Sequence, residues 1–181
     1  IEEVIPEDCV VILTQSGDFL LKGRYVVPIR DIAGNVTAWV GWFPDNRKYI
    51  TTPTVGFSKD GQFFNIECYK KCIEENKGTV YLVEGIFDAL SLRALGYNAL
   101  GNMGIDISIV KVSLYGLCRR WVAIPDNDKR GREVLKNDLW KLPVNGSYLR
   151  WVGSFEEDVQ IKDIDKFCSL FEDSSICHML D

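Results

Sequence analysis

Acidic residues that could hold a metal ion gather at three places in the second half of the chain. The acids are Glu84 in V-E-G-I-F-D, Asp126 and Asp128 in I-P-D-N-D, and Asp163 and Asp165 in K-D-I-D. A single acidic pair is more often a surface charge or a helix cap. Three groups meeting at one place would repel one another unless a cation sat between them. Such all-oxygen sites suit Mg²⁺ or Mn²⁺, which neutralise a pyrophosphate and activate a hydroxyl group.

The predicted strands explain how the acids would meet. An apolar run at 79–84 ends on Glu84. Gly85 then lets the backbone turn directly into a helix that carries Asp88. A second apolar run at 120–125 ends just before Asp126. Ligands bind beyond the carboxyl ends of the strands in an open parallel sheet. We therefore expect a metal site at that edge, with Asp88 completing its surface.

The pattern of apolar residues predicts an α/β fold, in which a parallel sheet is flanked by helices and preceded by a small mixed α+β subdomain. In the second half, strands are expected at 79–84, 97–100, 120–125 and 147–152 and helices at 87–95, 105–117 and 129–142. Before them, strands are expected at 25–32, 36–43 and 48–50, a turn at 33–35 and a helix at 65–76. The domains would be 1–76, 77–168 and a C-terminal tail at 169–181.

Composition sets the class of protein. The chain has 181 residues, of which 46% are hydrophobic, enough to bury a core. No apolar run approaches the roughly 18 to 20 residues of a membrane span, and Ile1 is followed by acids rather than by a secretory leader. A start without Met suggests an excised fragment. The six cysteines favour reduced thiols in the cytoplasm rather than disulfides or structural zinc, and the net charge of −5 argues against a simple nucleic-acid coat.

An ordered set of motifs resembles a known family. E-G-I-F-D, followed by D-N-D-x-x-G, is similar to the Toprim domain of bacterial-type primases, topoisomerases and some nucleases. Upstream, V-P-I-R-D-I-A-G-N-V, R-K-Y-I-T-T-P and F-S-K-D-G resemble the segment that precedes Toprim in DnaG-type primases. Downstream, K-D-I-D-K-F resembles the third acidic motif. The resemblance implies a Toprim parallel sheet preceded by a basic subdomain at 1–76.

The same resemblance implies roles for individual residues. Glu84 would be the catalytic acid nearest the reacting phosphate and a candidate general base. The metal ligands would be Asp126 and Asp128, with Asp88, Asp163 and Asp165 around them. A loop near the site would contain Gly101 and Gly104. The basic residues Arg30, Lys48 and Lys59 would contact phosphates of a nucleic-acid template.

The implied function is that of a DNA primase catalytic core, a nucleotidyltransferase that uses Mg²⁺ or Mn²⁺ to make short RNA primers from nucleoside triphosphates on single-stranded DNA. A replicative helicase would be its partner through regions outside this chain, with no membrane involved. Two alternatives remain open: a metal-dependent Toprim nuclease and a non-catalytic nucleic-acid-binding module. Where the family usually has G-G-R, this chain has Val40-Gly41-Trp42, so one expected basic contact is missing.

Overall fold

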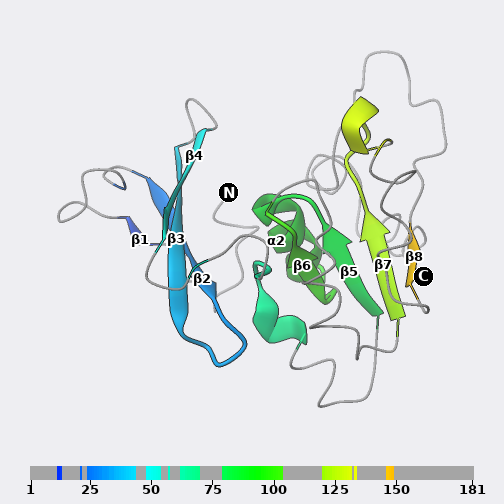
Figure 1. Cartoon of the computed structure of the whole chain (residues 1–181), viewed down its shortest axis with the longest axis horizontal. Helices are drawn as coiled ribbons and strands as arrows, with labels where there is room; N and C mark the ends of the chain where they lie inside the picture. Colours follow the sequence, from blue (N-terminus) through cyan, green and yellow to red (C-terminus); the bar gives the residue numbers. More distant parts are fainter. Residues whose placement is uncertain are drawn as a thin grey trace.

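The computed structural model describes residues 12–13, 21, 24–43, 48–53, 57, 62–69, 79–103, 120–131, 133 and 146–148. They form an antiparallel sheet and a parallel sheet, seen side by side in Figure 1. The antiparallel sheet has the order β1-β2-β3-β4, with strands Ile12–Leu13, Tyr25–Arg30, Val36–Phe43 and Lys48–Pro53. The parallel sheet has the order β6-β5-β7-β8, in which the strands β5 to β8 are Thr79–Val83, Ala99–Gly101, Arg120–Ile124 and Gly146–Tyr148. The predicted fold class is confirmed.

The turn between β2 and β3 begins earlier than the sequence pattern indicated. β2 ends at Arg30 rather than at residue 32, because Asp31 closes the turn. Its Oδ1 accepts a hydrogen bond from the backbone N–H of Asn35 at 2.8 Å, and its carbonyl accepts one from Gly34 at 2.9 Å. The side-chain hydrogen bond from Asn35 lowers the pKa of Asp31 below its ordinary value. Gly34 has a φ of 89°, the left-handed conformation that such a turn requires.

The central strands of the parallel sheet are buried on both faces. This burial explains their unbroken apolar runs, which are typical of parallel strands covered on both sides. One face of β5 presents Tyr81 and Val83 to a first hydrophobic cluster, and the other presents Val80 and Leu82 to a second. The second cluster contains Trp121 of β7, which is fully buried. The register of β5 is therefore fixed from both sides, since a slip by one residue would exchange the two faces.

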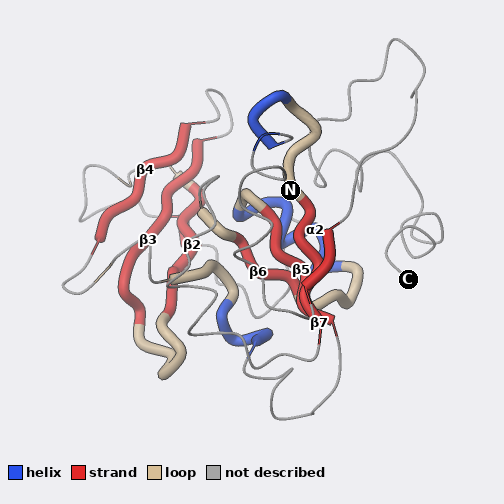
Figure 2. The backbone as a smooth tube through the Cα atoms, turned by 45° about the vertical axis from the view of Figure 1, so that its right-hand side comes forward, coloured by secondary structure: helices blue, strands red, loops and turns tan. Residues whose placement is uncertain are grey.

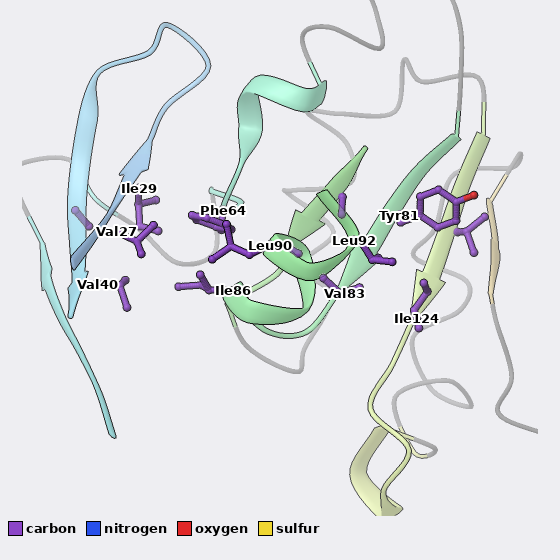
Figure 3. Packing of buried hydrophobic residues seen from close by; sticks show 14 residues of the cluster. Val27, Ile29, Val40, Phe64, Tyr81, Val83, Ile86, Leu90, Leu92 and Ile124 are labelled. Carbon is purple, nitrogen blue, oxygen red and sulfur yellow. The ribbon is translucent and has the colours of Figure 1, made fainter. Parts of the chain in front are cut away.

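Helix α2 (Ile86–Ala94) lies between the two sheets, and all three elements share the first cluster (Figure 3). The cluster takes Val27, Ile29, Ala38 and Val40 from the antiparallel sheet, Ile86, Ala89, Leu90 and Leu92 from α2, and Tyr81, Val83, Val122 and Ile124 from the parallel sheet. An aromatic contact lies beside it. The ring of Trp42 in β3 is 4.9 Å from the ring of Phe87 in α2 and 5.9 Å from that of Tyr25.

The residues that end α2 also determine where the next strand begins. Gly96 has a φ of 87°, and the N–H groups of Gly96 and Tyr97 donate to the carbonyls of Arg93 and Leu92. This arrangement satisfies carbonyls that the last turn of a helix leaves open. As a result, β6 begins at Ala99, whereas the sequence predicted a strand from residue 97.

Several expected elements lie partly or wholly outside the described residues. They are the helix at 105–117, most of the helix at 129–142, the end of the helix at 65–76 and the end of the strand at 147–152. None of the helices in the described ranges is long and apolar enough to cross a membrane. Cys68, the cysteine that these ranges include, is a thiol outside any disulfide, and its Sγ donates to the carbonyl of Ala99 at 3.4 Å.

The shared core leads to a prediction about Leu90, whose side chain is fully buried between the sheets. Leu90→Ala should lower the free energy of unfolding by about 2 to 5 kcal/mol, because it leaves a cavity. Urea transitions followed by tryptophan fluorescence and by far-UV circular dichroism should shift together. As a control, Ile32→Ala at the exposed hairpin tip should change stability by less than about 0.5 kcal/mol. A shift seen by only one probe would contradict a core shared by both sheets.

Candidate active site

The candidate site lies at the carboxyl ends of β5 and β7. These strands are parallel neighbours, and their register pairs Val83 with Ile124. The arrowheads of both strands point to the same end of the sheet in Figure 1. Glu84 follows β5 directly, and Asp126 follows β7 after Pro125. Because neighbouring strands are only about 4.8 Å apart, the two acids leave the sheet at the same edge, as the sequence predicted.

Glu84 is half-buried at the start of the turn into α2. That turn is held by Asp88, whose side chain is buried. Oδ2 of Asp88 accepts a hydrogen bond from the backbone N–H of Gly85 at 3.0 Å, which satisfies a donor at the helix start. Asp88, predicted as part of the metal-binding surface, therefore has a structural contact that fixes the backbone next to Glu84.

Residues 126–128 form a short loop that leads into a helical turn at 129–131, visible at the end of β7 in Figure 2. Asp126 is buried, and Oδ1 of Asp128 accepts a hydrogen bond from the N–H of Gly131 at 2.8 Å. A Cβ atom at Gly131 would lie 2.1 Å from the carbonyl oxygen of Asp126. The D-N-D-x-x-G motif thus ends in glycine because the chain returns onto its own backbone. The described part of the chain offers no hydrogen-bond donor to the second carboxylate oxygen of Asp128.

The loop after β6 adjoins the same edge. Gly101 is buried, and a Cβ atom there would lie 2.9 Å from the carbonyl oxygen of Gly85. The N–H of Asn102 donates to the carbonyl of Val83 at 2.8 Å. Gly101 is the last residue of β6 rather than part of the predicted loop, and it lies beside both neighbours of Glu84. Gly104 lies outside the described residues.

Two of the predicted template-binding cations, Arg30 and Lys48, belong to strands of the antiparallel sheet. Arg30 ends β2, its Nη1 donates to the carbonyl of Gly34 at 2.9 Å, and its Nε lies 3.5 Å from a carboxylate oxygen of Glu67. Both charged side chains are substantially exposed, so this ion pair contributes little to stability. Lys48 begins β4, where its backbone pairs with Phe43. Lys59 lies outside the described residues, as do Asp163 and Asp165.

Asn65 and Asn102 are buried polar residues that the sequence analysis did not single out. Asn65 follows two phenylalanines and has a φ of 63°. An asparagine in an apolar run was a usable signal, because asparagine adopts the left-handed conformation more readily than most residues.

The carboxylates described at this edge are oxygen ligands of the kind that Mg²⁺ and Mn²⁺ prefer. Among the residues in the described ranges, no three acidic, cysteine or histidine side chains form a metal-binding group by themselves. Mg²⁺ often binds through one or two carboxylates, with waters and substrate phosphates completing its shell. Asp126 and Asp128 supply carboxylates of that kind.

Comparisons with known proteins agree with this fold. Residues 81–168 match the family described as Toprim-like. The chain is 36% identical over 124 residues to a DNA primase of Thermotoga maritima, an alignment that covers 64% of this chain and 21% of the relative. The chain thus spans about a fifth of the length of that relative.

Solved structures extend the likeness to nearly the whole chain. The zinc-binding and RNA polymerase domains of the Aquifex aeolicus primase align with a TM-score of 0.71 and 23% identity, covering 95% of this chain and 43% of that one. A DnaG primase catalytic domain bound to single-stranded DNA aligns with a TM-score of 0.72 and 20% identity, covering 94% of this chain and 55% of that one. Residues 81–168 therefore match the Toprim-like family, in a chain that has the fold of the catalytic core of DnaG-type DNA primases.

Proposed function

We propose that this chain is the catalytic core of a DNA primase, which joins nucleoside triphosphates into short RNA primers on a single-stranded DNA template. The reaction would make it a metal-dependent nucleotidyltransferase. Its domains would be a basic subdomain at 1–76, the Toprim domain at 77–168 and a tail at 169–181. A replicative helicase would bind through regions outside this chain, and the protein would act in the cytoplasm.

The observation that carries the proposal is the extent of the likeness. The sequence relationship to the Thermotoga maritima primase covers more residues than the Toprim-like match alone, and the structural likeness includes the antiparallel sheet. A Toprim nuclease would use the same acidic edge, but the upstream motifs are not expected in one. The two sheets also share a single core through α2, so the upstream part is built as a unit with the acidic edge.

Each acid at the edge has a proposed task. Asp126 and Asp128 would hold Mg²⁺ or Mn²⁺, and Asp163 and Asp165 would complete the metal-binding surface together with Asp88. A divalent ion at that place would neutralise charge on the departing pyrophosphate and lower the pKa of the attacking hydroxyl. Glu84 would accept the proton of that hydroxyl or help to hold a metal. The hydrogen bond from Gly85 to Asp88 keeps the turn behind Glu84 in place.

The template would run along the N-terminal subdomain. Arg30, Lys48 and Lys59 would contact its phosphates, which fixes the position of the strand without reading its sequence. The contact of Arg30 with Gly34 and Glu67 holds its guanidinium near the hairpin while leaving it partly exposed. Gly101 and Gly104 would line the approach to the metal site, since Gly101 already adjoins Gly85.

The first test of this function is a template-directed incorporation assay with the Glu84→Gln variant. The change keeps the shape of the side chain and removes its charge. Primer synthesis should be almost abolished, whereas binding of single-stranded DNA and the melting temperature should be unchanged, or the melting temperature slightly raised, because one repelling carboxylate is gone.

Glu133→Gln provides the matched control, since Glu133 is an exposed carboxylate that is not among the predicted site residues. It should remain as active as the wild type. Degradation of the template without incorporation by the wild type would indicate a nuclease instead. A Glu84→Gln protein that unfolds while its folded fraction stays active would show that Glu84 is structural.

A second prediction concerns metal affinity. Asp126→Asn and Asp128→Asn should each weaken the binding of Mn²⁺, measured by electron paramagnetic resonance, because each removes a negative oxygen ligand. We expect at least about a tenfold loss, as for the removal of a supporting interaction at a metal site. Glu133→Gln should leave the affinity unchanged. Equal affinities in all the proteins would remove these aspartates from the site.

A third prediction concerns the template. Lys48→Ala should weaken binding of single-stranded DNA about equally for different sequences, because a phosphate contact carries no sequence information. The slope of log affinity against log salt concentration should become less steep by about one unit. Fluorescence anisotropy over a salt series measures both quantities. An unchanged affinity and slope would exclude Lys48 from the interface.

A further inference from the structure

Asn65 is a buried amide held in an uncommon backbone conformation. It is 5% exposed and has a φ of 63°, which few residues other than glycine adopt. It lies in the segment 62–69, between the two sheets in sequence, just before the helical turn at 66–69. Its neighbour Phe64 lies between Ile29 of β2 and Leu90 of α2 in Figure 3. The left-handed turn at Asn65 therefore lies next to the core that both sheets share.

Both ends of the amide are used. Nδ2 of Asn65 donates to the carbonyl of Ala99, the first residue of β6, at 2.8 Å. Oδ1 accepts from Nη1 of Arg93, in the last turn of α2, at 2.7 Å. Burial lowers the pKa of Arg93, so this hydrogen bond replaces solvation that the guanidinium has lost. One side chain thus ties the end of α2 to the start of β6.

Backbone hydrogen bonds of Phe64, the residue before Asn65, connect this turn to the acidic edge. Phe64 and Gly101 exchange two hydrogen bonds, at 2.8 Å and 3.2 Å. Gly101 adjoins the carbonyl of Gly85, and Asn102 donates to Val83, the residue before Glu84. A shift at Asn65 would therefore reach the backbone on both sides of Glu84.

We propose that Asn65 is a positioning residue: through Arg93 and Ala99 it fixes the end of α2 and the start of β6 relative to each other, and so aligns Glu84 with Asp126. The proposal rests on the proposed primase function. Asn65 does not touch substrate. Its loss should lower the rate of the chemical step rather than the binding of template, because small misplacements at a reacting centre cost rate.

The key variant is Asn65→Gly, since glycine keeps the left-handed backbone and removes only the two amide contacts. In the template-directed assay, kcat should fall about tenfold while KM for the template changes less than about twofold. Arg93→Met leaves Asn65 in place and removes the guanidinium that donates to its Oδ1. It should lower kcat about threefold, and it decides the question if Asn65→Gly does not fold.

Thr37→Val is the matched control for a merely structural loss. The hydroxyl of Thr37, a buried residue of the antiparallel sheet, donates its one proton to Oε1 of Gln62 at 2.7 Å, and its Oγ1 lies 3.2 Å from the carbonyl oxygen of Ile29. Its removal should lower the melting temperature as much as Asn65→Gly does, yet leave kcat unchanged. The backbone amide NMR signals of Gly85, Gly101 and Asn102 should move in Asn65→Gly and stay in place in Thr37→Val.

The outcomes separate this inference from the proposed function. A wild-type protein that makes no primer overturns the function and this inference with it. An active wild type with kcat unchanged in Asn65→Gly overturns the positioning role alone. Equal losses of kcat in Asn65→Gly and Thr37→Val would also overturn it, because the effect would then follow stability rather than alignment.

Discussion

The parallel pairing of β5 with β7 is the interaction on which the rest of the structure depends. The pairing runs along the full length of both strands, and apolar clusters on both faces of the sheet fix its register. Parallel strands leave the sheet at the same edge, so the pairing delivers Glu84 and Asp126 to one place. Burial on both faces keeps that place from shifting, since a slip of one residue would exchange the side chains that pack on the two faces of the sheet.

Helix α2 extends this constraint to the antiparallel sheet. Its apolar side chains pack against both sheets, and Asp88 anchors its start beside Glu84. Trp42 stands at the position where the family usually has a basic residue. In this chain the residue contributes an aromatic ring that packs against Phe87 of α2. The position that lacks a cation thus strengthens the contact between the antiparallel sheet and α2, and phosphate contacts would have to come from other residues such as Arg30 and Lys48.

The sequence predicted well where most of the described strands begin, because strands depend on local patterns. β3 lies where the alternation placed it, and Glu84 and Asp126 follow strands whose apolar runs are plain in the sequence. Three contacts were harder to foresee. They are the hydrogen bond from Gly85 to Asp88, the close approach of Gly131 to Asp126 and the amide contacts of Asn65. These depend on which backbone atoms come together in three dimensions, and periodicity carries no information on that. The packing of both sheets against α2 is a long-range feature of the same kind.

The central claim is that the acids at the ends of β5 and β7 hold a divalent metal for nucleotidyl transfer. The most direct measurement is an anomalous difference map from crystals of the protein soaked in Mn²⁺ and a nucleoside triphosphate. We expect a manganese peak about 2.2 Å from carboxylate oxygens of Asp126 or Asp128, with triphosphate oxygens on the same ion and Glu84 beside the ion. Manganese and triphosphate bound only elsewhere, with this edge empty, would contradict the account.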